Sequence, residues 1–339
     1  MNPDALAAAA LVAVDPAGLG GLVLRAPHGP DRDAWLGWLQ SLLPPGAPMR
    51  RMPAQAGDAA VLGGLDLPAT LQAGRPVMQP GLLAQADGGL VTLAMAERLP
   101  AAMAARLAAV LDTGEVAVQR DGLDTRLPAR VGFVALDEGV DDDEHLPGAL
   151  RERLALRLEA EGLRGFAEGL ADDDASPGPA VAQARARLLQ VQAPAEILEA
   201  LCGAALALGV DSLRASQLAL RAACASAAWD GREQVNADDA ALAVRLVLAH
   251  RATRLPAPPE SQADDAPPET PDDPPPQDAS ADASNDPPPP DPSADDPPDT
   301  EASAPDDVTM PAAFLVIPAA PSRTLPPART VASMKSSAR

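Results

Sequence analysis

Aromatic side chains are scarce in this sequence. Its 339 residues include three Phe, three Trp and no Tyr, so aromatics make up only 2%. Proteins that bind single-stranded nucleic acid stack bases on aromatic rings, and proteins that bind duplexes neutralise phosphates with Lys and Arg. Here the formal net charge is −22, with 48 acidic against 26 basic residues. The composition therefore argues against a nucleic-acid partner.

Cysteine is almost as rare. Cys202 and Cys224 fall in separate apolar stretches, without the Cys-x-x-Cys or Cys/His spacing that a structural metal site requires. We expect both to be reduced core residues of helices, and we expect no metal site on this chain.

A long hydrophobic run is also missing. Residues 5–14 are apolar, but a bilayer-spanning helix needs about 20 such residues. Asp4 precedes the run, where a signal peptide would carry basic residues. The sequence therefore predicts a cytoplasmic protein without a membrane span.

Composition divides the chain into a globular part and a tail. Residues 256–307 consist almost entirely of Pro, Asp, Ala, Ser and Glu, and they hold 16 of the 48 acidic residues. Such a segment cannot bury enough apolar surface to offset the entropy of ordering, so it should form a disordered, stiff tether. We expect an acidic Pro-rich linker at 255–307 and a short tail at 308–339.

The first part of the globular region alternates between strand-like and helix-like segments. The order strand, loop, helix at residues 21–43 is that of a P-loop unit. Alternation of this kind predicts an α/β sandwich with a mostly parallel sheet over residues 1–170. Predicted strands are 21–24, 59–62, 89–94, 115–120 (an edge strand) and 130–136, and predicted helices are 5–14, 31–43, 68–73 and 99–111.

The second part reads as helix only. Helical segments are predicted at 180–192, 195–208, 212–229 and 237–252. Asn236 is a natural N-cap for the last of them, with Asp238 and Asp239 in its first turn. A helical subdomain should therefore occupy residues 171–254.

The predicted P-loop lacks the residues that bind nucleotide. A working loop reads G-x-x-x-x-G-K-[ST], in which amides cradle phosphates, Lys neutralises them and the hydroxyl holds Mg²⁺. In the loop here, residues 26–33, the first Gly is replaced by Ala26, Arg32 stands in place of the Lys, and Asp33 replaces the hydroxyl residue. Gly29 remains, but prolines on both sides of it remove amide donors.

The acidic pair that should follow a neighbouring strand is missing as well. ATP hydrolysis needs one carboxylate for Mg²⁺ and one to activate water. The strand at 90–93 leads instead into Ala94 and Met95, and Glu97 falls out of register. Two independent losses predict a chain that does not hydrolyse ATP.

Two arginines are candidates for a role across a subunit boundary. Arg153 follows an acidic loop, and Arg214 opens a helix of the helical subdomain. An arginine finger reaches into a neighbour's site and stabilises charge on the transferred phosphoryl group. The alternative is that each is an ordinary surface or salt-bridged residue.

Several sequence blocks together resemble the D subunit of magnesium chelatase, a member of the AAA+ group, in the form found in bacteriochlorophyll-making bacteria. The most specific blocks are GLDL at 64–67, PGLLA at 80–84, and RAACASAAWDGR at 221–232. The resemblance implies an AAA+ αβα sandwich with a helical lid. It also implies that Arg153 is the arginine finger and Arg214 the sensor-2 arginine.

The resemblance further implies a function and partners. Family members form a ring-like platform with the ATPase subunit I and act on a third, porphyrin-carrying protein, the H component, so that ATP hydrolysis drives Mg²⁺ insertion into protoporphyrin IX. ATP and Mg²⁺ would be bound mainly by subunit I. A degenerate MoxR-like adaptor that matures another metalloprotein is the alternative, and an active ATPase with an altered pocket is a third interpretation.

One departure from the family pattern concerns the region after the linker. Family members continue into a von Willebrand A domain whose metal site begins D-x-S-x-S, and the nearest strings here, at 278–282 and 291–296, do not match it. We therefore expect a fragment or a truncated reading frame, with 308–339 a remnant.

Overall fold

The computed structural model describes residues 2–120, 122–141, 143–169 and 177–254. The predicted linker at 255–307 and tail at 308–339 lie outside these residues, as does the predicted boundary between the α/β part and the helical part at 170–171.

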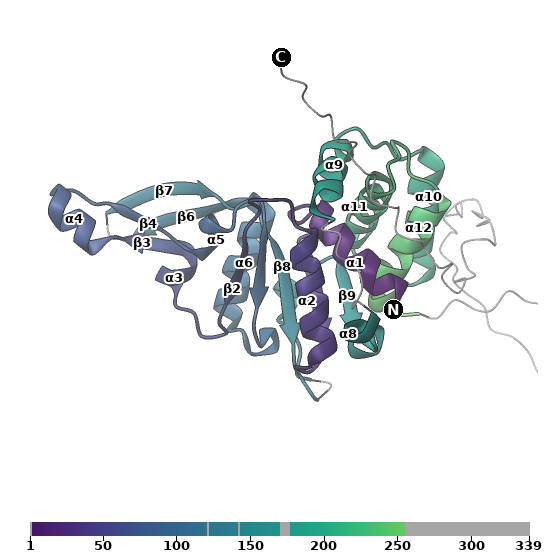
Figure 1. The fold of residues 1–339 in the computed structure, drawn as a ribbon, viewed down its shortest axis with the longest axis horizontal. Helices are drawn as coiled ribbons and strands as arrows, with labels where there is room; N and C mark the ends of the chain where they lie inside the picture. Colours follow the sequence, from purple (N-terminus) through teal and green to yellow (C-terminus); the bar gives the residue numbers. More distant parts are fainter. Residues whose placement is uncertain (1, 121, 142, 170–176, 255–339) are drawn as a thin grey trace, which may run out of the picture. The chain divides into compact units, whose positions relative to one another are not determined.

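A five-stranded, all-parallel sheet forms the centre of the α/β part (Figure 1). Its strand order is β2-β5-β8-β1-β9, and β1 pairs with β8 on one side and β9 on the other. The three inner strands are buried along nearly their whole length, as both faces of a parallel sheet must be. The strands are β1 (Gly21–Arg25), β2 (Met49–Met52), β5 (Leu90–Leu93), β8 (Gly132–Asp137) and β9 (Leu156–Glu159).

Helices cover both faces of this sheet, which confirms the predicted αβα sandwich. Along β1 the side chains alternate: Leu22 and Leu24 join the core under helices α1 (Pro3–Val14) and α2 (Pro30–Leu42), whereas Val23 joins the core under α6 (Ala101–Thr113). This alternation follows from the two-residue period of a strand. Short helices α7 (Gly148–Arg151) and α8 (Phe166–Gly169), with helical turns at Ala96–Arg98 and Ala160–Leu163, complete the α/β part.

The predicted strand at 59–62 is wrong. These residues lie in helix α3 (Asp58–Leu62), because Gly57 and Asp58 start a helical turn and a short apolar run does not distinguish strand from helix. The chain then forms β3 (Gly63–Leu65), α4 (Leu67–Ala73), β4 (Met78–Pro80) and α5 (Leu82–Gln85), with β3 and β4 paired antiparallel.

The predicted edge strand at 115–120 forms, but it is not part of the main sheet. It is β6 (Glu115–Arg120), which pairs antiparallel with β7 (Leu123–Pro128) in a separate hairpin. The two edges of the main sheet are instead β2 and β9, which sequence analysis missed. Both carry charged residues, which protect sheet edges from pairing but obscure the strand pattern.

Within the described residues, four helices form the second part: α9 (Gly178–Leu188), α10 (Ala195–Ala207), α11 (Leu213–Trp229) and α12 (Ala237–Ala243). The last continues through a π-helical turn, Val244–Leu248, and a 3₁₀ turn, Ala249–Arg251. Asn236 caps α12 as predicted, with a reciprocal hydrogen bond to Asp239. Helix α11 contacts α9, α10, α12 and α1, so it joins this bundle to the α/β part.

The two cysteines only partly match the prediction. Cys224 is half-buried on α11, and burial raises the pKa of its thiol. Cys202 is exposed on α10, so its assignment as a core residue is wrong. Within the described ranges, no helix combines the length and apolar character needed to cross a bilayer.

Candidate functional site

The candidate site lies at the carboxyl edge of the sheet, where the chain passes from β1 into α2. The Ala26 amide donates to the Asp137 carbonyl at the end of β8, 3.1 Å away, and the Arg25 guanidinium lies 3.6 Å from the Asp137 carboxylate. These contacts hold the 26–29 loop at the edge where α/β sheets bind ligands.

The loop lacks the geometry of a phosphate cradle. Gly29 has an extended backbone with φ 176°, and a Cβ placed on it would meet no atom within 4 Å. Pro27 and Pro30 offer no N–H. A cradle needs a run of amides that converge on the anion, so this loop has little with which to hold a triphosphate.

Arg32, at the position of the P-loop lysine, is bound by its own chain. Its side chain is only 7% exposed, and Nη1 donates to Glu138 Oε1 at 2.7 Å and to the Ala26 carbonyl at 3.2 Å. Nη2 lies 2.9 Å from His28 Nδ1. The Glu138 carboxylate therefore binds the Arg32 guanidinium, which would otherwise be free to bind phosphate. Sequence analysis missed Glu138, although it directly follows the buried strand β8.

The two aspartates beside Arg32 point elsewhere. Asp33, at the position of the magnesium-binding hydroxyl, is exposed and lies 3.6 Å from His28 Nδ1. Asp31 accepts from the amides of Gly165 and Ala167 at 3.2 and 2.9 Å, and so fixes the start of α8. This structural contact was not foreseen from the sequence.

The end of β5 carries no acid. Leu93 is in register with Ala135 of β8, and the Ala94 amide donates to the Met52 carbonyl at 3.1 Å. Met95 follows with a left-handed backbone, φ 46°, and a side chain that is 42% exposed. Neither Ala94 nor Met95 can bind Mg²⁺ or activate water.

Glu97 is the acid closest in sequence to these positions. Its side chain is 4% exposed, and Oε2 accepts from the Glu138 amide at 3.0 Å while Oε1 lies 3.4 Å from Arg98. It supports the segment that holds Arg32, which agrees with the expectation that it is out of register for catalysis.

A cavity of about 280 Å³ lies beside the loop. Its lining includes His28, Arg32, Asp33 and Thr92, and Thr92 stands two residues before Ala94 on β5. The 26–33 loop and the end of β5 therefore meet at one edge of the sheet. The residues present do not fit a nucleotide with its magnesium, because Arg32 is neutralised, Ala94 and Met95 carry no carboxylate, and Glu97 is engaged by the Glu138 amide.

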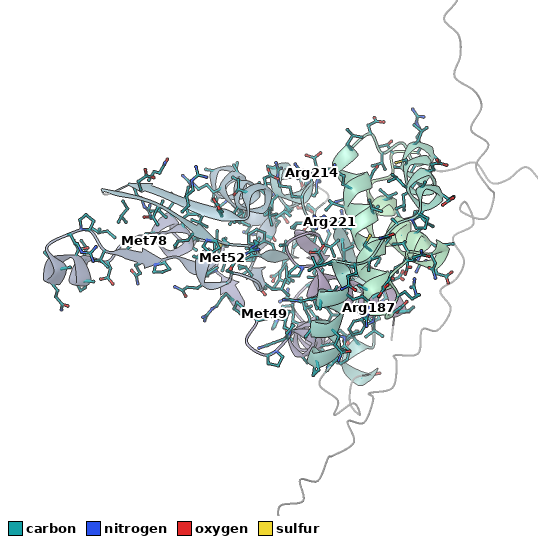
Figure 2. All side chains as sticks on the ribbon, turned by 90° about the horizontal axis from the view of Figure 1, so that it is seen from above. Met49, Met52, Met78, Arg187, Arg214 and Arg221 are labelled. Atoms are coloured by element: carbon teal, nitrogen blue, oxygen red, sulfur yellow. The ribbon has the colours of Figure 1, made fainter. Side chains whose placement is uncertain are left out.

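The two candidate arginines are brought together on a single carboxylate. Arg153 donates to Asp112 of α6 through Nε at 2.9 Å and Nη2 at 2.6 Å, and Arg214 donates to the same carboxylate through Nη1 at 3.0 Å. Arg214 lies in the first turn of α11, and Figure 2 labels it together with Arg221 of the same helix. The structure thus brings Arg153 and Arg214 together on Asp112, although they lie 61 residues apart in the sequence.

Charge pairing shifts the protonation equilibria of this cluster. The hydrogen bond from Arg153, with the positive charges of Arg153 and Arg214, lowers the pKa of Asp112. The hydrogen bond to Asp112 raises the pKa of Arg153 in turn. Asp112 is therefore an ionised partner of both arginines throughout the neutral range. Sequence analysis missed Asp112 because no motif or residue spacing around it indicates a functional role.

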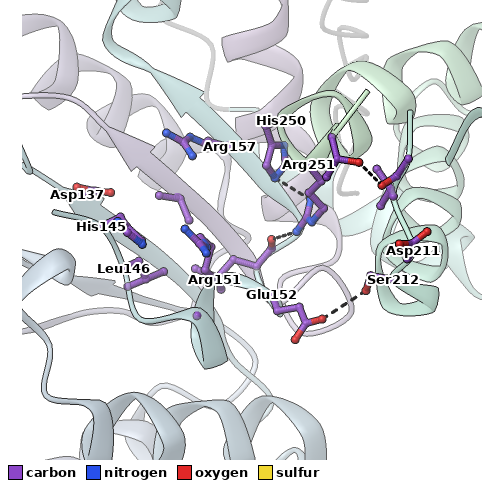
Figure 3. A pocket seen from close by; sticks show the side chains of 16 residues that line it. Asp137, His145, Leu146, Arg151, Glu152, Arg157, Asp211, Ser212, His250 and Arg251 are labelled. Carbon is purple, nitrogen blue, oxygen red and sulfur yellow. Dashed lines mark hydrogen bonds between the residues drawn. The ribbon is translucent and has the colours of Figure 1, made fainter. Parts of the chain in front are cut away.

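A second cavity, of about 640 Å³, is lined by Arg157 of β9, by the segment before β9 and by the end of the helical part (Figure 3). On its wall, Arg251 donates to the carbonyls of Leu154 and Ala155, at 2.7 and 2.9 Å, and to Nε2 of His250. Burial, and then the charges of Arg251 and Arg157, lower the pKa of His250 to about 3. This cluster fixes the backbone that follows Arg153.

Comparisons with known proteins agree with this architecture. The AAA lid domain family matches residues 198–271. A solved structure of a proposed ATPase from Cytophaga hutchinsonii superimposes with a TM-score of 0.54 at 15% identity, over 72% of this chain and 81% of that one. At this identity the structural match shows the fold alone, and the family match assigns an AAA lid to residues 198–271.

Sequence relatives are more specific. The chain is 43% identical to the magnesium-chelatase 60 kDa subunit of Cereibacter sphaeroides over 78% of its own length, and it spans 42% of that relative. It is 29% identical to the 67 kDa subunit of Chlorobaculum tepidum, of which it spans 44%. It is also 30% identical to the 38 kDa subunit of Cereibacter sphaeroides over 62% of its own length, and it spans 68% of that subunit. The chain therefore belongs to the family of magnesium-chelatase subunits built on an AAA+ module.

Proposed function

We propose that this chain is a non-hydrolysing AAA+ subunit of magnesium chelatase. In this proposal it forms a platform for the ATPase subunit I, which corresponds to the 38 kDa relatives, and the assembly inserts Mg²⁺ into protoporphyrin IX for bacteriochlorophyll synthesis. The porphyrin is carried by the H component, and the assembly works in the cytoplasm. The ATP and Mg²⁺ belong to subunit I.

The state of the nucleotide position supports this proposal most strongly. Arg32 is bound to Glu138 at 2.7 Å, and Ala94 and Met95 leave β5 without a carboxylate. Catalysis of phosphoryl transfer depends on charge that stabilises the γ-phosphate and on a positioned metal and water. A site that lacks both requirements does not turn over ATP.

The arginine pair supports a role at a neighbour's site. Arg153 and Arg214 come from the two different parts of the module, yet their guanidiniums share one carboxylate and remain partly exposed, at 19% and 41% of their side chains. In the proposed assembly Arg153 acts as arginine finger and Arg214 as sensor-2 arginine toward ATP bound by subunit I.

The proposed domain layout follows from the same assembly. Residues 1–170 are the degenerate α/β core, 171–254 the lid, 255–307 an acidic Pro-rich tether and 308–339 a short tail.

Co-purification tests the proposal. Tagged chain is mixed with the 38 kDa-type ATPase subunit and recovered with and without ATP. The proposal predicts that the two proteins are retained together and that ATP increases the amount retained. If the ATPase subunit is not retained under either condition, the chain is not its platform.

A further inference from the structure

Asp112 of helix α6 accepts hydrogen bonds from two arginines, Arg153 and Arg214, which come from different parts of the chain. Arg153 approaches it with two nitrogens in the planar fork arrangement, and Arg214 adds a third. Two guanidiniums around one oxyanion form the arrangement with which proteins bind a phosphate group. In the chain by itself, a carboxylate fills that arrangement.

The backbone that carries Arg153 is fixed by contacts that do not involve Asp112. The Ala155 amide donates to the Leu19 carbonyl at 2.9 Å, and Arg251 holds the carbonyls of Leu154 and Ala155. Gly20 packs directly on the Arg153 carbonyl, because a Cβ there would lie 2.3 Å from that oxygen. Apart from Asp112, the Arg153 side chain donates only through Nη1 to the nearby Ala149 carbonyl at 2.7 Å, so it can turn away from the carboxylate while its backbone stays in place.

We propose that Asp112 is an internal substitute for phosphate: it closes the Arg153–Arg214 pair in the lone chain and gives way to the terminal phosphate of a nucleotide bound to a neighbouring subunit. The inference rests on the proposed function, since it requires a neighbour that binds nucleotide. Beyond that function, it assigns to Asp112 the part of a carboxylate that competes with phosphate, so that Arg153 and Arg214 become available only when the subunits assemble.

The charges favour such an exchange. A terminal phosphate carries up to two negative charges and three acceptor oxygens, against one charge and two oxygens on Asp112. The Asp112 side chain is 34% exposed, so water can hydrate the carboxylate once the guanidiniums leave it, which lowers the cost of the exchange. At an interface from which water is excluded, the doubly charged group attracts the guanidiniums more strongly.

The test compares the variant Asp112→Asn with wild type in the full chain. Removing the carboxylate charge frees the arginines in advance, so half-maximal stimulation of the ATPase subunit should need about two- to fivefold less chain, the factor that an exposed ion pair corresponds to. Asp58→Asn is the matched control. Asp58 of α3 accepts a hydrogen bond at 2.9 Å from Arg106, which lies on α6 as Asp112 does. Among the described residues, Asp58 is not a partner of Arg153 or Arg214, so Asp58→Asn should leave the half-maximal concentration unchanged.

A second measurement needs no partner. Phenylglyoxal modifies free guanidiniums, and mass spectrometry gives the modification rate at each arginine. In the isolated chain, Arg153 and Arg214 should react faster in Asp112→Asn than in wild type, whereas Asp112→Glu should react as slowly as wild type. Asp112→Glu changes the side chain but keeps the charge, so a faster reaction in Asp112→Asn alone comes from the lost charge and not from disturbed folding.

The outcomes separate the two proposals. If wild type fails to stimulate the ATPase subunit, the proposed function fails, whatever the modification rates are. If wild type stimulates but a folded Asp112→Asn variant needs as much chain as wild type or more, Asp112 does not compete with phosphate and the inference is overturned. Equal modification rates at Arg153 in all variants would overturn it as well.

Discussion

The Arg32 guanidinium and the Glu138 carboxylate form a 2.7 Å ion pair at the place where an active P-loop protein holds phosphate. Arg32 belongs to the first turn of α2, and Glu138 follows the central strand β8. The pair therefore joins the two elements between which a nucleotide would bind. The position that corresponds to the P-loop lysine is therefore part of the folded structure.

Replacing Glu138 by Ala should destabilise the chain by about 1–3 kcal/mol, because it leaves a buried guanidinium without its carboxylate. Arg32 is 7% exposed, so water cannot fully replace the lost partner. Urea unfolding followed by circular dichroism measures the change. Glu115→Ala is the control: Glu115 pairs with Arg126, which is 70% exposed, so its loss should change stability by less than about 0.5 kcal/mol. Equal effects of the two substitutions would contradict a structural role for the Arg32–Glu138 pair.

Gly20 should tolerate no side chain. It has φ +65°, and an added Cβ would lie 2.3 Å from the Arg153 carbonyl oxygen. Gly20→Ala should therefore cost about 1–3 kcal/mol and displace the segment that carries Arg153. Gly37→Ala, on the exposed side of α2 with open space around it, should stabilise the chain by about 0.5–1 kcal/mol. Thermal unfolding of both variants decides the matter, and a neutral Gly20→Ala would show that the close approach is not required.

His250 should make stability depend on pH. Its folded-state pKa is lowered to about 3 from 6.5, because burial and the Arg251 and Arg157 charges disfavour the protonated ring. His250 is exposed by surface area and lines the 640 Å³ cavity, so the lowered pKa comes from the density of protein atoms and cations around the ring and not from complete enclosure. Between these two values the unfolded chain binds the additional proton, so acid favours unfolding, and stability falls as the pH drops below about 6.5. Unfolding measured at about pH 7 and about pH 4 should show a smaller loss for His250→Gln than for wild type. The same loss in both would mean that His250 titrates normally.

The sequence was sufficient to predict the features that depend on local pattern. The buried runs that form β1, β5 and β8, and the strand–loop–helix order at α2, placed Arg32 and the end of β5 at one edge of a parallel sheet. The edge strands β2 and β9 were not predicted, because each has only four residues and charged side chains interrupt the apolar pattern.

The partners of the site residues could not be predicted in the same way. Glu138 lies 106 residues from Arg32, and Asp112 lies 41 and 102 residues from its two arginines. Such pairings are set by how helices and strands pack, and no local spacing reports them. Arg153 and Arg214 were identified by resemblance, but their common carboxylate emerged only from the three-dimensional arrangement.

Stimulated ATPase activity tests most directly whether this chain supplies charge to a neighbour's ATP and turns over none itself. The chain alone, the 38 kDa-type ATPase subunit alone, and their mixture are assayed with wild type, Arg153→Ala and Arg126→Ala. Arg126 is an exposed arginine of the β6–β7 hairpin and serves as the control. We predict no turnover by the chain alone, stimulation by wild type and Arg126→Ala, and loss of stimulation in a folded Arg153→Ala variant. Turnover by the isolated chain, or full stimulation by Arg153→Ala, would contradict this role.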